Sequence, residues 1–140
     1  MSHLALPSQP VGDFTITAVS DGYLHASFDF LANIDPAEAS RMQENAGITD
    51  HTSIHINCYL VRGGGRTILI DAGAGGFKQW GGRLTANLLL AGIHPSEIDA
   101  ILLTHAHPDH VGGGDERIRG SRLSECRACR PPSGSRVLAG

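Results

Sequence analysis

The chain lacks the features that would place it in a membrane, among disulfide-bonded proteins or on a nucleic acid. No apolar run is long enough to cross a bilayer, and the first residues have neither the cationic segment nor the apolar core of a signal peptide. Three cysteines, an odd number, do not make a disulfide framework. A formal net charge of −3 provides no basic surface for nucleic acid or anionic lipid. We therefore expect a cytoplasmic protein that has no nucleic-acid partner and no membrane partner.

The chain is long enough, and hydrophobic enough, to bury one modest hydrophobic core. It has 140 residues, 41% of them hydrophobic, and an unusually high number of glycines, 18. Residues 1–10 are expected to form an N-terminal arm. Residues 14–19 alternate as a half-buried strand does, and Ser20-Asp21-Gly22 predicts a turn before a second short strand at 23–30. The segment 35–47 opens with an aspartate N-cap followed by proline, which predicts a helix.

The middle of the chain alternates between strand and helix patterns around glycine-rich connections. The expected elements are strands at 53–61, 66–71 and 100–103, a hairpin turn at 63–65 and a helix at 83–91. Three consecutive apolar residues, Ile68-Leu69-Ile70, indicate a strand that is buried on both faces. This order predicts an α/β fold whose functional site lies beyond the carboxyl ends of the strands.

Most of the isolated histidines and cysteines have simple structural interpretations. His51 and His55 lie at strand edges, where polar surface is the expected role, so we leave both out of the site. His94 is interpreted as a helix-terminal residue favoured by the helix dipole. Cys58 falls inside an apolar strand pattern, and we expect a buried thiol there.

Possible metal ligands are concentrated directly after the strand at 100–103. His105, His107, Asp109 and His110 lie within six residues, between an apolar run and a pair of glycines. Imidazole nitrogens and carboxylate oxygens are ligands that zinc prefers. In an extended loop, side chains two residues apart point the same way, so the first two histidines can reach one ion. Pro108 fits a loop that feeds a helix, and such a turn would swing His110 toward a second ion.

The segment from Thr104 to Gly113, Thr-His-Ala-His-Pro-Asp-His-Val-Gly-Gly, resembles the signature of the metallo-β-lactamase superfamily. Asn57–Val61 together with Leu69–Gly73 resembles the first motif of that family. The resemblance covers residues 11–114 and implies the N-terminal half of an αββα metallo-β-lactamase sandwich. The sequence around Asp71 and the helix that follows it looks most like the lactonase and methyl parathion hydrolase branch.

The resemblance also implies a function and a set of ligands. In such proteins two zinc ions are bound, the first by the residues matching His105 and His107 and the second by those matching Asp109 and His110. Asp109 is the candidate catalytic residue, and Asp71 and Thr104 are expected to support the ligands from behind. The implied activity is zinc-dependent hydrolysis of a small-molecule lactone, ester or organophosphate, and the chain is a possible homodimer.

The end of the chain departs from that family pattern. Residues 115–140 are rich in arginine, contain no histidine and carry the pair Cys126 and Cys129, which we do not interpret as a metal site. One permissible choice of codons for residues 115–130, read one nucleotide later, gives TNGFAGPVFPNAELVV, which continues as the family does. We therefore interpret residues 115–140 as an aberrant, frameshifted and disordered tail. The later ligands of the family are then missing, and we expect weak metal binding and little hydrolysis.

Two other functions remain open from the sequence. The chain could be a non-catalytic metal-binding fragment, or its ancestor could be a thioesterase similar to glyoxalase II, whose metal loop is closely similar. Zinc is the expected metal, although manganese, iron and cobalt suit the same ligands.

Overall fold

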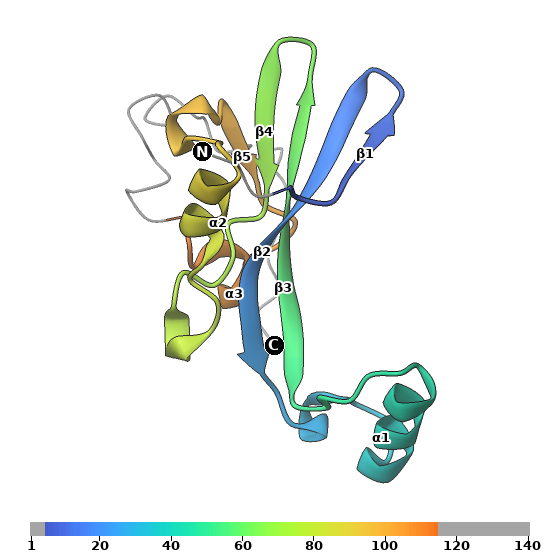
Figure 1. Cartoon of the computed structure of the whole chain (residues 1–140). Helices are drawn as coiled ribbons and strands as arrows, with labels where there is room; N and C mark the ends of the chain where they lie inside the picture. The colour runs from blue at the N-terminus through green and yellow to red at the C-terminus, as the bar shows by residue number, and fades with distance from the viewer. Residues whose placement is uncertain (1–4, 115–140) are drawn as a thin grey trace, which may run out of the picture.

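The fold is one five-stranded mixed sheet with helices at its side and ends, described by a computed structural model for residues 5–114 (Figure 1). The strand order follows the chain, β1-β2-β3-β4-β5; the first four strands pair antiparallel and the last pair, β4 and β5, is parallel. The predicted α/β class is confirmed. The strands are β1 (Ser8–Val11), β2 (Phe14–His25), β3 (Ser53–Gly63), β4 (Arg66–Ile70) and β5 (Ala100–Leu102).

Three short α-helices interrupt the sheet-forming sequence at α1 (Pro36–Asn45), α2 (Leu84–Leu90) and α3 (Pro108–Val111). The prediction for α1 is confirmed, because the Asp35 side chain accepts hydrogen bonds from the amides of Ala37 and Glu38. Single 3₁₀ turns lie at Phe28–Phe30, Phe77–Gln79 and Pro95–Glu97. Within residues 5–114, none of the helices has the length and apolar character needed to span a bilayer.

The predicted N-terminal arm is wrong for Ser8–Pro10, because β1 is an edge strand paired with β2. Val11 pairs with Phe14 across a two-residue loop, and Gly12 has a φ of 57°. Gly-Asp between two extended segments favours a tight hairpin, so the signal was present in the sequence. Pro10 is tolerated because an edge strand leaves one side of its backbone without a ladder partner.

The predicted turn at Ser20-Asp21-Gly22 is also wrong, because β2 runs through it from Phe14 to His25. The extra residue is absorbed as a bulge, with a register shift between Ser20 and Gly22 against β3. Gly22 has a φ of 113°, and a Cβ there would lie 3.2 Å from the Gly81 Cα. The predicted second strand at 23–30 is therefore the end of β2 followed by a 3₁₀ turn.

His94 differs from its predicted role at the end of a helix. It is the N-cap of the 3₁₀ turn Pro95–Glu97: its side chain accepts from the Ser96 amide, and the Glu97 carboxylate accepts from the His94 amide. The proline that follows His94 favours this reciprocal cap, because it suits the first position of a helical turn.

One face of the sheet is buried beneath α2 and the segment that follows it. The core contains Val19, Cys58, Leu60, Leu69, Leu84, Leu88, Ile93 and Ile98. The prediction of a buried thiol at Cys58 is confirmed, and burial raises the pKa of that thiol to about 12, with the charges of Asp21 and Asp71 adding to the rise. The predicted burial of β4 on both faces is wrong for the described residues: Leu69 is fully buried, whereas Ile68 and Ile70 are only partly so.

Candidate metal centre

The histidine-rich loop lies at the carboxyl ends of the two parallel strands. β4 ends at Ile70 and β5 at Leu102, and the Asp71 amide donates to the Leu102 carbonyl over 2.8 Å. This bond places Asp71 beside the start of the loop at Thr104. The loop then extends to His107, which is the N-cap residue of α3. The predicted arrangement of an extended loop that turns into a helix at Pro108 is thus observed.

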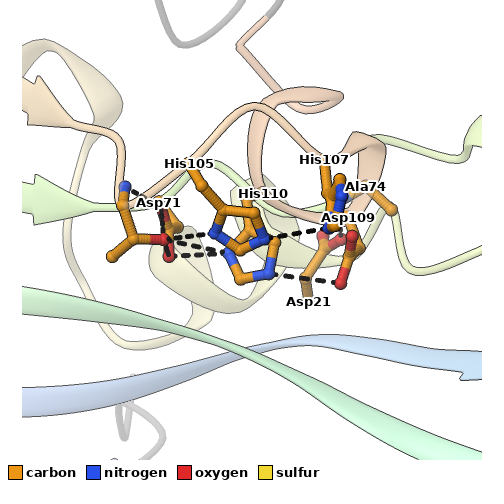
Figure 2. A network of polar contacts seen from close by, with 8 residues as sticks. Asp21, Asp71, Ala74, His105, His107, Asp109 and His110 are labelled. Atoms are coloured by element: carbon orange, nitrogen blue, oxygen red, sulfur yellow. Dashed lines mark hydrogen bonds and ion pairs between the residues drawn. The ribbon is translucent and has the colours of Figure 1, made fainter. Parts of the chain in front are cut away.

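The four predicted ligands lie together on this loop and the single turn of α3 (Figure 2). The Nε2 atom of His105 lies 3.1 Å from Nδ1 of His107, as expected for side chains two residues apart. The Nε2 atom of His110 lies 3.3 Å from an Asp109 carboxylate oxygen. The rings of His105 and His110 are 3.9 Å apart between centroids, so the two pairs of donors are neighbours. His105 and His107 are exposed, which leaves this cluster open to solvent.

Asp71 connects the sheet to the donor cluster. Its carboxylate accepts from the Thr104 amide at 2.8 Å and from the Thr104 hydroxyl, and it lies 2.8 Å from Nδ1 of His110. Burial raises the pKa of Asp71, but the hydrogen bonds from Thr104 and His110 outweigh it and bring the pKa below its usual value. A neutral His110 that donates from Nδ1 to this carboxylate carries its lone pair on Nε2, the nitrogen on the side of Asp109.

Asp21 is a buried polar residue that sequence reasoning missed. Its side chain is 0% exposed and accepts from the amides of Ala74 at 2.8 Å, Gly82 at 3.0 Å and Leu84 at 2.9 Å. The sequence predicts a turn at this position because Asp-Gly is a common turn pair. The alternation of β2 was the available signal, since the period that places Val19 inside also places Asp21 inside.

The donors agree with zinc in kind, but the described part of the chain supplies too few of them for a closed site. Structural zinc sites use four protein ligands, and catalytic sites use three together with a water molecule. Within residues 5–114, no group of three or more His, Cys, Asp or Glu side chains is placed to hold one metal ion. The geometry therefore provides two adjacent pairs of donors.

The two histidines that we left out of the site, His51 and His55, contact residues elsewhere in the chain. His55 lies 2.6 Å from the Ser20 hydroxyl and stacks on Tyr23, and His51 contacts Ser40 and the Ile48 carbonyl. Both histidines thus make contacts outside the metal loop. The tail, its two cysteines and the frameshift hypothesis lie outside the described residues, so they stay predictions.

Comparison with known proteins assigns the loop to a family. Residues 52–116 match the family model described as the metallo-beta-lactamase superfamily. This segment of the chain belongs to that superfamily. The chain is also 45% identical over 56 residues to the ribonuclease TTHA0252 of Thermus thermophilus, a match that covers 40% of this chain and 12% of the ribonuclease.

Two solved structures match most of the chain. The hydrolase AbOPH superimposes with a TM-score of 0.69 at 33% identity, over 81% of this chain and 40% of AbOPH. The dizinc quorum-quenching lactonase AidC superimposes with a TM-score of 0.68 at 32% identity, over 77% of this chain and 38% of AidC. The chain therefore spans less than half the length of each of these relatives, and the predicted fold family is confirmed for the part that it spans.

Proposed function

We propose that this chain carries the first part of the dinuclear zinc centre of a metal-dependent hydrolase. His105 and His107 are assigned to one ion, and Asp109 and His110 to the other. The observation that carries the proposal is the convergence of these four side chains at the ends of β4 and β5. The contact of His110 with a carboxylate behind it adds to the argument, because metal-binding histidines usually donate their second nitrogen to such a partner.

The residues of this chain would orient and position the reacting groups. Bound zinc would supply Lewis-acid activation of water and of the substrate's carbonyl or phosphoryl oxygen. Asp109 is proposed as the catalytic ligand, and Asp71 and Thr104 would fix the direction in which His110 points. The proposed substrates are lactones, esters or organophosphates. This choice is supported by the similarity to AidC, which is described as a dizinc lactonase with a bound homoserine product.

The remaining ligands would come from outside residues 5–114. The sequence after Gly114 contains no histidine, and its only acidic residues are Asp115, Glu116 and Glu125. Another chain, such as a second copy in a homodimer, is one source of a further imidazole. For the 140-residue chain alone we propose weak metal binding and little turnover, because each ion would have two protein ligands instead of three.

Zinc titration of single-alanine variants tests the proposed ligands. We expect His105→Ala, His107→Ala, Asp109→Ala and His110→Ala each to weaken zinc binding by at least about tenfold, because each removes one of few direct ligands. His51→Ala is the matched control: it removes an imidazole outside the loop and should leave the affinity unchanged. Equal affinity in the loop variants and the control would refute the ligand assignment.

A non-catalytic metal-binding module is the second candidate. It is favoured by the absence, within residues 5–114, of a group of three donors placed around one ion. Hydrolysis of an acyl-homoserine lactone and of paraoxon, measured with saturating zinc, separates the two functions. Turnover that disappears in Asp109→Ala would support the hydrolase, whereas zinc binding through the same four residues with no turnover would support the module.

A further inference from the structure

The buried carboxylate of Asp21 lies at the centre of a loop that leads to the donor cluster. The segment 71–82, which we call the glycine loop, leaves β4 at Asp71 and ends at Gly82, just before α2. Asp21 binds this loop at both ends, through the Ala74 amide near its start and the Gly82 amide at its finish. Amides that donate to a buried carboxylate make stronger bonds than neutral pairs do, so these contacts fix the path of the loop.

The fit between Asp21 and the glycine loop leaves no room for side chains. A Cβ on Gly73 would lie 2.4 Å from the Asp21 Cγ, and a Cβ on Gly81 would lie 2.0 Å from its Oδ2. Both glycines also have positive φ values, 71° and 54°. These two glycines thus allow backbone to approach a buried carboxylate.

The glycine loop in turn holds α3 by direct backbone contact. The Ala72 amide donates to the His110 carbonyl at 2.8 Å, and the Gly113 amide donates to the Gly73 carbonyl at 3.0 Å. A Cβ on Gly113 would lie 1.9 Å from the Ala72 carbonyl oxygen. A displacement of the loop would therefore be passed to α3, which carries Asp109 and His110.

We infer that Asp21 is a positioning residue for the candidate metal centre, acting through the glycine loop on the helix that presents Asp109 and His110. The inference rests on the proposed metal-binding function. It adds a residue from β2, distant from the histidine motif along the chain, to the set that determines the geometry of the site.

The two carboxylate oxygens of Asp21 have different partners, which allows a selective variant. Oδ1 accepts from Gly82 at the end of the glycine loop and from Leu84 in α2, whereas Oδ2 accepts from Ala74 near the start of the loop. In Asp21→Asn the amide oxygen can keep both bonds to the α2 side. The amide NH₂ then faces the Ala74 N–H, so the bond to the start of the glycine loop is lost and two donors oppose each other.

Hydrogen exchange of the metal-free chain tests this inference without relying on activity. In Asp21→Asn we expect the amides at 72–76 and 110–113 to exchange about tenfold faster or more, because a buried donor loses its partner. The amides of α2 should keep their wild-type rates. The cobalt spectrum of the variant should also differ from that of the wild-type protein, since the donors on α3 are displaced.

Asn87→Ala is the matched control, because it removes another anchor between α2 and β2. The Asn87 side chain donates to the Ser20 carbonyl at 2.8 Å, an acceptor on β2 outside the glycine loop. The control should speed exchange in α2 and leave residues 110–113 and the cobalt spectrum unchanged. The inference is overturned if both variants change the same amides, or if Asp21→Asn leaves residues 110–113 protected. Failure of the wild-type chain to bind cobalt would instead refute the proposed function.

Discussion

At the scale of single residues, Asp71 has a strained backbone conformation and contacts Thr104 and the candidate ligand His110 through its carboxylate. It has a left-handed φ of 61°, which is uncommon outside glycine, at the point where β4 gives way to the glycine loop. This conformation turns its carboxylate toward Thr104 and His110. Strained residues of this kind persist where the surrounding contacts fix them, and they often lie at functional sites.

Replacing Asp71 by asparagine is expected to weaken zinc binding by about tenfold to hundredfold, a usual cost of removing a carboxylate behind a metal-binding histidine. The reason is that the amide no longer offers two acceptor oxygens to Thr104 and His110. Isothermal titration with zinc measures the effect. Asp99→Asn is the control, since Asp99 accepts from the Thr67 amide at the opposite end of β4. An Asp71→Asn affinity equal to that of the control would contradict this role.

Asp50 gives the clearest prediction for pH dependence. Hydrogen bonds from the side chains of Ser53 and Thr52 and from the Thr52 amide lower the pKa of Asp50 from 3.8 to about 2. The folded state therefore holds the proton less tightly than the unfolded state does. The stabilisation is fully present above the unfolded pKa and is lost as the pH falls through the folded pKa.

We expect Asp50→Asn to be less stable than the wild-type chain above pH 3.8, with the difference shrinking as the pH falls toward 2. Urea unfolding of both proteins at a series of pH values measures this difference. A difference that stays constant from neutral pH to the acid limit would show that ionised Asp50 does not stabilise the fold.

At the scale of elements, α2 covers part of the buried face of the sheet through Leu84 and Leu88. Leu88 is fully buried in the core, whereas Leu90, two residues later, is 59% exposed. Leu88→Ala should lower the free energy of unfolding by about 2–5 kcal/mol, because it removes buried methyl groups and leaves a cavity. Leu90→Ala should change it by about 0.5 kcal/mol or less. Chemical denaturation compares the two, and similar losses would mean that α2 does not pack as described.

The sequence predicted the elements that carry strong local signals. The N-cap of α1, the glycine turn after β3 and the apolar face of α2 depend on neighbours in the chain, and the structure confirms all three. The interpretation failed at 20–22, where Asp-Gly indicates a turn locally. There the deciding partners of Asp21 are the amides of Ala74, Gly82 and Leu84, more than fifty residues away. Local propensity does not contain such contacts.

At the scale of the whole molecule, the described sheet is covered on one face only. On the other face, Tyr59 and Leu102 are 43% and 49% exposed and lie in one row across β3, β4 and β5, with Ile70 between them. Apolar surface of this kind usually contacts another layer or another chain. The exposed face agrees with a chain that spans 40% of AbOPH and 38% of AidC.

The candidate site could be predicted from the sequence more completely than the fold. The His105 to His110 motif is short, so its geometry follows from an extended loop, a proline and one helical turn. The contribution of Asp21 could not be predicted, because it acts through two successive sets of backbone contacts. The one-sided core could not be predicted either, since the run Ile68-Leu69-Ile70 describes only the strand's own composition.

The metal content of the purified chain tests the central claim most directly. After zinc loading and dialysis against metal-free buffer, mass spectrometry should find well under two ions per chain, because residues 5–114 offer each ion only two protein ligands. The residual zinc should be lost in a variant that combines His105→Ala with His110→Ala. Two retained ions per monomeric chain, or zinc that persists in the double variant, would contradict the account of a partial centre built on these residues.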